Sequence, residues 1–168
     1  MSIRDAVPAD VAALAAIYDH YVRTSVATFD VEEVGTQVLA AKIESIGGSD
    51  HVIVADVDGV MLGFAYSGPF RPRPAYAATK EVSVYLAAGA RGRGLGRALY
   101  SELLRRLDSD PAVHTQMAVI ALPNRASEAL HLASGFRHLG TLEAVGHKFG
   151  RWVDTAYYQR IARDGPRL

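Results

Sequence analysis

The chain has 168 residues, of which 49% are hydrophobic, and its 18 basic side chains (Lys and Arg) equal its 18 acidic ones. These figures predict one folded domain over residues 1–168 and argue against nucleic acid or an anionic membrane as a partner, because both select basic patches. The absence of cysteine excludes disulfides, thiolate nucleophiles and cysteine-based metal sites.

The first half of the chain predicts three strands and two helices. Residues 1–5 hold no apolar signal region and no apolar run is long enough to cross a bilayer, so we expect a cytoplasmic protein. The expected elements are a strand at 3–4, a helix opened by residues 8–10, a helix over 36–46, and strands over 51–56 and 60–67. Asp58-Gly59 is a strong hairpin signal between the last two strands.

The second half continues this alternation of strands and helices. Prolines interrupt residues 68–79, which we expect to form an arginine-bearing loop. The further elements expected are a strand over 81–86, a helix from Leu95 through Leu107, a central strand over 114–122, a helix over 124–134, and strands over 137–148 and 153–161. The tail, residues 163–168, is expected to fray.

The most informative segment lies between the strand over 81–86 and the helix that begins at Leu95. It contains three glycines in five residues and three arginines: Arg91, Gly92, Arg93, Gly94, Leu95, Gly96 and Arg97. Glycine amides can approach a ligand closely, and a helix N-terminus attracts anions. The segment therefore predicts a phosphate or pyrophosphate site.

Two common phosphate-binding loops fit this segment poorly. A Walker loop needs Gly-Lys-Ser/Thr, whereas Arg97-Ala98 follows the third glycine. A dinucleotide-binding loop needs Gly-x-Gly-x-x-Gly early in the chain and an acidic residue further on, whereas this loop reads Gly-x-Gly-x-Gly after the midpoint. The third interpretation is the pyrophosphate loop of acyl-CoA-dependent N-acetyltransferases, whose Arg/Gln-x-x-Gly-x-Gly/Ala pattern residues 91–96 match.

Nearly the whole chain resembles the phosphinothricin / methionine sulfoximine acetyltransferase branch of the GNAT superfamily. The segments that carry this resemblance are residues 27–29, 67–71, 81 with 83–85, 122–124, 130–131 with 135–136, and 146–154, with Lys148-Phe149-Gly150-Arg151-Trp152 pointing to the branch. The resemblance implies an α/β (α+β) GNAT fold, in which helices flank a mixed, mostly antiparallel twisted sheet that is splayed at its centre. It also implies acetyl-CoA as co-substrate, a small amine substrate and a homodimer.

In such a fold the splayed strands hydrogen-bond the pantetheine arm as an added strand would. The resemblance assigns these main-chain contacts to Val84, Tyr85 and Leu86, the pyrophosphate contacts to residues 91–97, and a further cofactor contact to Asn124. A plain helix cap explains Asn124 equally well.

Acetyl transfer to an amine calls for a base, because the amine arrives mostly protonated. Glu81 is the first candidate, since it begins the strand that would hold the thioester and the branch carries a glutamate there. His131 is the second, because the branch carries a histidine there, although a buried structural histidine is the competing interpretation. Tyr85, Tyr157 and Tyr158 remain open as the acid for the thiolate. The histidines show no ligand spacing, so we expect no metal.

The substrates of the branch are small amino acids whose side chains end in a phosphinate, sulfoximine or sulfone. Guanidinium groups suit both this end and the carboxylate. We therefore expect Arg71 and Arg73 to act as clamps, Phe70 as an apolar wall and Lys80 as added charge. Residues 27–29, with Phe29, and the segment 148–152 are expected to complete the pocket, from the same subunit or from the second subunit of a homodimer.

The preferred function is acetylation of the α-amine of phosphinothricin, methionine sulfoximine or methionine sulfone. Arg73-Pro74 and Val82 depart from the pattern of the branch, which leaves another acceptor open: an amino acid, a polyamine or a protein N-terminus. A non-catalytic acyl-CoA-binding module is the alternative from a different class.

Overall fold

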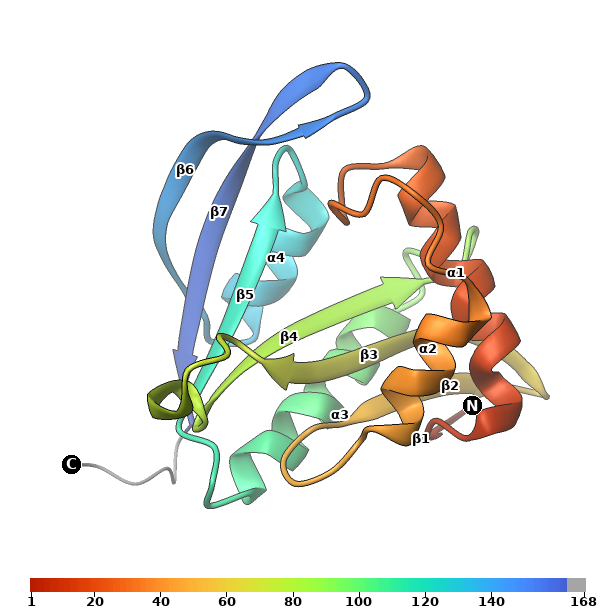
Figure 1. Ribbon diagram of the computed structural model, residues 1–168. Helices are drawn as coiled ribbons and strands as arrows, with labels where there is room; N and C mark the ends of the chain where they lie inside the picture. The colour runs from red at the N-terminus through yellow and green to blue at the C-terminus, as the bar shows by residue number, and fades with distance from the viewer. Residues whose placement is uncertain (163–168) are drawn as a thin grey trace.

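The computed structural model describes residues 1–162 of the chain, and the tail expected to fray lies outside this range. Seven strands form one sheet in the order β1-β2-β3-β4-β5-β7-β6 (Figure 1). The strands are β1 (Ser2–Asp5), β2 (Val52–Val57), β3 (Val60–Pro69), β4 (Thr79–Leu86), β5 (Thr115–Ala121), β6 (Arg137–Lys148) and β7 (Arg151–Ile161). The helices are α1 (Val11–Thr24), α2 (Gly35–Glu44), α3 (Leu95–Ser109) and α4 (Arg125–Ala133), with short 3-10 turns at Pro8–Asp10 and Pro74–Tyr76. The mixed, mostly antiparallel sheet flanked by helices is confirmed.

The sheet splits at its one parallel pair of strands. β4 pairs with β5 only over residues 79–81 and 115–117, and beyond these residues the two strands diverge (Figure 1). The other pairs are antiparallel and continuous along most of their lengths. The expected central splay is therefore present, at the place where the glycine loop begins.

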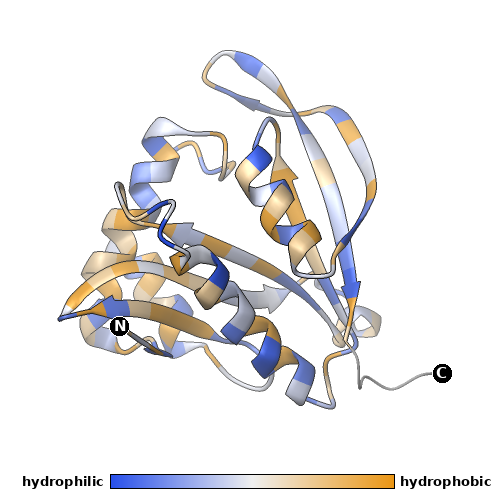
Figure 2. Ribbon diagram, turned by 180° about the vertical axis from the view of Figure 1, so that it is seen from behind, coloured by the Kyte–Doolittle hydropathy of each residue, from blue (hydrophilic) through white to orange (hydrophobic). Residues whose placement is uncertain are grey.

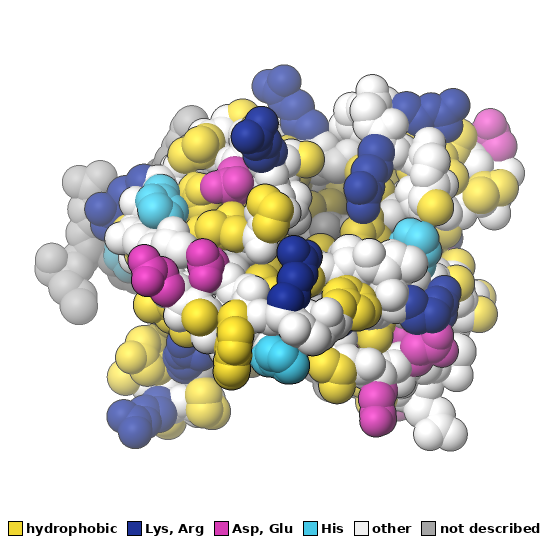
Figure 3. All heavy atoms as spheres, turned by 90° about the horizontal axis from the view of Figure 1, so that it is seen from above, with side chains coloured by type: hydrophobic (Ala, Val, Ile, Leu, Met, Phe, Trp, Pro, Cys, Tyr) yellow, Lys and Arg dark blue, Asp and Glu magenta, His cyan; other side chains and the backbone are white. Residues whose placement is uncertain are grey.

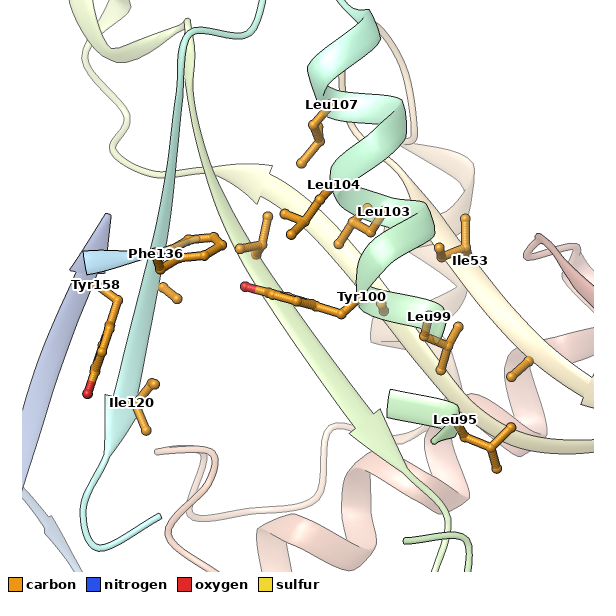
Figure 4. Close-up of a cluster of buried hydrophobic side chains, with 14 of the residues drawn as sticks. Ile53, Leu95, Leu99, Tyr100, Leu103, Leu104, Leu107, Ile120, Phe136 and Tyr158 are labelled. Carbon is orange, nitrogen blue, oxygen red and sulfur yellow. The ribbon is translucent and has the colours of Figure 1, made fainter. Parts of the chain in front are cut away.

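Two apolar layers hold the sheet between helices. On one face, α1 and α2 pack over β2, β3 and the aromatic ring of Tyr85. On the other face, leucines of α3 fill the space against Ile53, Ile120, Phe136 and Tyr158 (Figure 4). Viewed from behind, the apolar stripe of α3 turns toward the sheet and its charged stripe faces outward (Figure 2). Burial of this stripe is the main force that holds the N-terminus of α3 beside the split.

A few boundaries differ from those predicted. α2 ends at Glu44, before the predicted residue 46. The Ser45 amide makes the last helical bond, to the Ala41 carbonyl, and the next amide, of Ile46, bonds only three residues back to Ile43. The Ser45 hydroxyl bonds to the Lys42 carbonyl. The loop expected over 68–79 contains the 3-10 turn Pro74–Tyr76, since a proline at the first position has the φ that such a turn needs. These shifts leave every predicted strand and helix in place.

Candidate active site

A groove of about 480 Å³ opens where β4 and β5 separate. Seen from above, this side of the molecule is hollowed near its centre, with basic side chains around the hollow (Figure 3). The predicted cofactor residues that line the groove are Val84, Tyr85, Leu86, Arg91, Gly92, Gly94, Gly96, Arg97 and Asn124. The exposed side chain of Arg93 and the buried side chain of Leu95, which packs in the core, lie outside its wall.

The hydrogen bonding of β4 decides which of its backbone groups face the groove. The Phe70 amide donates to the Thr79 carbonyl, and the Ala87 amide donates to the Leu62 carbonyl. In an antiparallel ladder such bonded positions recur every second residue. The odd-numbered residues of β4 therefore turn their N–H and C=O groups toward β3, and the even-numbered residues turn theirs toward the groove.

Three residues were predicted to bind pantetheine through the main chain. The backbone N–H and C=O of Val84 face the groove and are not hydrogen-bonded to a neighbouring strand, because β5 pairs only with residues 79–81. Leu86 also faces the groove, but the Tyr21 hydroxyl donates to its carbonyl oxygen (2.8 Å) and accepts from its amide (3.3 Å). The backbone of Tyr85 pairs with Phe64 of β3, so Tyr85 presents only its side chain to the groove.

The glycine loop builds a helix N-terminus that points into the groove. Gly92 and Gly94 both have a φ of 77°, in the left-handed region that L side chains rarely adopt. Gly94 precedes α3, and the first amide bonded within the helix is that of Ala98, which donates to the Gly94 carbonyl. The amides of residues 95–97 therefore have no partner within the helix. Together with Arg91 and Arg97 they form a site whose charge and donors suit a pyrophosphate.

Asn124 lies on the groove wall and also caps α4. Its Oδ1 accepts a hydrogen bond from the Ser127 amide at 3.2 Å. The capping interpretation is therefore confirmed, and it does not compete with a cofactor contact because the amide nitrogen of the side chain is not needed for the cap.

His131 extends from α4 into the same groove and is only 3% exposed. Its Nδ1 lies 2.7 Å from the Ser127 carbonyl oxygen, which can only accept, so Nδ1 carries the proton and Nε2 does not. Nε2 has no hydrogen-bond partner among residues 1–162. Burial lowers the pKa of His131, so the ring is neutral near pH 7.

Glu81 lies on the other face of the sheet from His131. It shares a face of β4 with Tyr85, which packs under α1 and α2, whereas His131 packs against Tyr100 of α3 with ring centroids 4.9 Å apart. The half-buried Glu81 lines a separate hollow of about 270 Å³. Burial raises the pKa of Glu81, and the nearby charges of Arg71 and Lys42 partly oppose this effect. The two candidate catalytic groups therefore border the split from opposite sides.

The loop after β3 places one of its two arginines near Glu81. The Arg71 guanidinium lies 4.6 Å from the centre of the Phe70 ring, which in turn packs edge-on against Tyr76. Arg73 is exposed, and only its carbonyl is engaged, by the Tyr76 amide. The structure thus brings Arg71 close to Glu81, and the clamp role stays a prediction for both arginines.

Lys80 does not add free charge to this site. It is 8% exposed, and its ammonium forms an ion pair with Asp50 at 2.7 Å. Its side chain alternates with that of Glu81 along β4, so the two point to opposite faces.

The β6–β7 hairpin holds the loop that carries Phe29. The buried Lys148 ammonium donates to the Thr28 carbonyl at 2.8 Å. The Phe29 ring lies directly on Gly146, where an added Cβ would come within 2.3 Å of two ring carbons. Residues 27–29 and 146–148, which both carried the resemblance, therefore form one contact within a single chain.

Of the three tyrosines considered as acid, only Tyr85 lines the groove. Burial raises the pKa of Tyr85 well above its ordinary value, so its hydroxyl keeps its proton. The Tyr158 hydroxyl donates to Glu128 at 3.2 Å.

Sequence reasoning missed the functional contacts of Tyr21 and did not consider Lys42 or Tyr66. The bonds of Tyr21 to Leu86 and Arg91 could not be foreseen, because 65 and 70 residues separate the partners. Within residues 1–162 no three His, Asp or Glu side chains cluster as metal ligands do. No helix in this range is long and apolar enough to cross a membrane.

Comparison with known proteins agrees with this geometry. Residues 3–157 match the family model described as an acetyltransferase (GNAT) domain. The chain is 41% identical to a phosphinothricin N-acetyltransferase of Streptomyces coelicolor, covering 95% of both, and 35% identical to an L-methionine sulfoximine/L-methionine sulfone acetyltransferase of Pseudomonas paraeruginosa, covering 94% of this chain and 92% of that one.

Two solved structures extend the comparison. A GNAT superfamily phosphinothricin acetyltransferase from Sinorhizobium meliloti in complex with acetyl-CoA superposes with a TM-score of 0.93 at 39% identity, covering 98% of this chain and 89% of the other. A ribosomal-protein-alanine N-acetyltransferase from Brucella melitensis superposes with a TM-score of 0.92 at 40% identity, covering 96% and 99%. The fold is therefore shared by proteins whose names point to different acceptors.

Proposed function

The chain belongs to the GNAT acetyltransferase family, and we propose that it transfers the acetyl group of acetyl-CoA to the α-amine of a small amino acid such as phosphinothricin, methionine sulfoximine or methionine sulfone. The observation that carries this proposal is the pairing of an anion-binding groove with a half-buried carboxylate beside Arg71. The names of the relatives support the same class of acceptor.

The groove suits the acetyl-CoA that this family uses. Val84 would hydrogen-bond the pantetheine arm through its main chain, and the amides of residues 95–97 with Arg91 and Arg97 would bind the pyrophosphate. When bound, acetyl-CoA supplies an activated acyl group as a thioester. An added Cβ at Gly92 or Gly94 would strain the loop, which agrees with a close approach of backbone to ligand.

In the proposed reaction the amine nitrogen bonds to the acyl carbon and the carbon–sulfur bond breaks. Glu81 accepts the proton that the amine loses, directly or through a water, and its raised pKa makes it a better base than an ordinary carboxylate. Tyr85 gives a proton to the departing sulfur, since its hydroxyl stays protonated beside the groove. His131 is the second candidate proton acceptor, because its unprotonated Nε2 lies buried in the groove wall without a hydrogen-bond partner among residues 1–162.

The charge around Glu81 favours a zwitterionic acceptor over a polyamine. Arg71 and Lys42 would repel a polycation, whereas they would attract a carboxylate. A protein N-terminus remains a second candidate, because one structural neighbour is named for a ribosomal protein.

The test is release of CoA from acetyl-CoA, followed with a thiol reagent, which meets no background because the protein lacks cysteine. The panel contains the three proposed acceptors, ordinary amino acids, a polyamine and a peptide. Saturable turnover confined to the three supports the proposal. Turnover of the peptide or polyamine alone would keep the acetyltransferase activity but assign a different acceptor. Acetyl-CoA binding without any turnover would support the binding-module alternative.

We also propose that the protein is a cytoplasmic homodimer. Exposed apolar side chains gather on β6, β7 and their turn: Leu139, Leu142, Val145, Phe149 and Trp152. Such a patch is typical of an interface. Light scattering after size exclusion should give twice the chain mass of 18.1 kDa. Trp152→Ser should weaken this association, whereas Val60→Ser, at an equally exposed site on β3, should not.

A further inference from the structure

An unpaired lysine lies on the α2 side of the hollow that contains Glu81. The Lys42 ammonium is 3.3 Å from the centre of the Tyr66 ring, a cation–π contact. It forms no ion pair within 4 Å with any of residues 1–162. Burial lowers its pKa to about 8, which leaves most of the population charged at pH 7. The carboxylates of Asp30, Asp50 and Glu81 partly oppose this lowering of the pKa, but none of them forms an ion pair with the ammonium. A buried cation without a direct ion pair that lines a cleft is a candidate binding group for a polar ligand.

Lys42 stands in the wall between two hollows. One is the hollow of about 270 Å³ that Glu81 lines. The other measures about 150 Å³, lies between α1, α2 and the sheet, and is lined mostly by apolar residues such as Leu39 and Phe64. Its wall also contains Asp30, whose carboxylate accepts a hydrogen bond from the Tyr18 hydroxyl at 2.6 Å. Lys42 and Tyr66 belong to both walls. A ligand that enters at Glu81 would therefore meet Lys42 before it meets an apolar end.

Glu81 has a cation on each of two sides. Arg71 approaches from the exposed loop after β3, and Lys42 approaches from α2, and each charge lowers the pKa of Glu81. Arg73 is exposed and is not among the charges that lower the pKa of Glu81. The two cations beside the base are thus Arg71 and Lys42.

We propose that Lys42 is a specificity-determining residue that binds the oxygen-rich end of the acceptor side chain, while Arg71 binds the acceptor carboxylate at the mouth of the hollow. This assignment rests on the proposed function. One cation cannot reach both groups of an amino acid when its amine points to Glu81, so two are needed. Guanidinium suits the planar carboxylate through paired bonds, and ammonium suits a tetrahedral group as a point charge. Lys42 thus takes the role that was expected of Arg73.

The test compares acceptors that differ in one group at a time, with Lys42→Met as the variant and Arg73→Met as its matched control. Methionine sulfone and methionine differ only in the two sulfone oxygens, and the decarboxylated amine of methionine sulfone lacks only the carboxylate. For Lys42→Met we expect kcat/KM to fall about 10- to 100-fold for the sulfone and its decarboxylated amine, as for a lost charged hydrogen bond. The value for methionine should change less than about threefold, and Lys42→Arg should restore part of the loss.

Equal losses for all three acceptors would overturn the proposal, since they would show that Lys42 acts on the fold or on Glu81. Losses for the sulfone and methionine but not for the decarboxylated amine would overturn it in favour of carboxylate binding. An equal effect of Arg73→Met would return the role to Arg73.

Calorimetric binding of methionine sulfone in the presence of CoA separates this inference from the proposed function. If the wild type binds the sulfone without turnover, the proposed function fails, and weaker binding by Lys42→Met would still support the lysine. If the wild type neither binds nor acetylates the sulfone, both fail.

Discussion

The two glycines that flank the start of α3 should respond in opposite ways to the same substitution. Gly94 has a φ of 77°, and an added Cβ there meets no atom within 4 Å. Gly94→Ala therefore adds backbone strain without a clash. Strain of this kind costs about 1–2 kcal/mol, which for a domain of this size lowers Tm by about 2–8 °C. The loop should also lose part of its anion-binding geometry, so KM for acetyl-CoA should rise.

Gly96 offers the matched comparison two residues along. It lies inside α3 without a positive φ, and an added Cβ would be 3.4 Å from Leu86 Cδ1, an ordinary contact. Gly96→Ala should therefore leave the unfolding free energy unchanged or raise it by up to about 1 kcal/mol through helix propensity. Its methyl group points to the groove, so KM for acetyl-CoA should rise here as well.

Urea unfolding and steady-state kinetics of both variants test this reasoning. Stability should fall for Gly94→Ala only, and cofactor affinity should fall for both. A Gly94→Ala protein as stable as the wild type would refute the strain argument, and unchanged KM values in both variants would refute the placement of acetyl-CoA in this groove.

Three further predictions follow from single side chains. Glu81→Gln should lower kcat about 10²- to 10⁴-fold with little change in acetyl-CoA affinity. In the wild type kcat/KM should fall as the pH drops through a pKa above the usual carboxyl range, because protonated Glu81 cannot act as base; a flat pH profile would contradict this role. Burial lowers the pKa of His131 in the folded protein, whereas in the unfolded chain the side chain binds a proton below pH about 6.5. The free energy of unfolding should therefore fall as the pH drops below this value. His131→Leu should reduce this loss in urea titrations at pH 7.5 and 5.5, and exposed His138→Leu should not. Lys148→Met removes the donor to the buried Thr28 carbonyl and should cost about 1–3 kcal/mol and raise the acceptor KM, whereas Arg151→Met, at an exposed site, should leave stability unchanged. Equal stability of the two last variants, measured in urea, would show that the hairpin does not anchor this loop.

Local sequence was sufficient for the secondary structure and for the position of the glycine loop at the start of α3. Alternation along residues 81–86, leucine spacing in α3 and the glycines between them are short-range signals. Glycine at positions 92 and 94 permits the left-handed φ that both residues adopt, because it carries no Cβ, whereas Gly96 in the same segment is helical. The order of strands carried no such local signal.

The tertiary structure decided how the site is divided. The register of β4 against β3 directs the backbone N–H and C=O of Val84 toward the groove and those of Tyr85 toward β3. Strand parity and the split between β4 and β5 place Glu81 and His131 on opposite faces. Neither result can be obtained from residue type, because a shift of one residue in register reverses which face each side chain occupies.

The same reason explains why the arginine-bearing loop was predicted to supply both anion-binding groups. A pattern along the chain identified Arg71 and Arg73 together, because they are neighbours in sequence. Lys42 lies 29 residues before Arg71, in a helix, and comes close to Glu81 only because α2 packs across Tyr66. Sequence by itself thus identified the acetyltransferase family and its glycine loop, and packing between distant elements decided which charges surround Glu81.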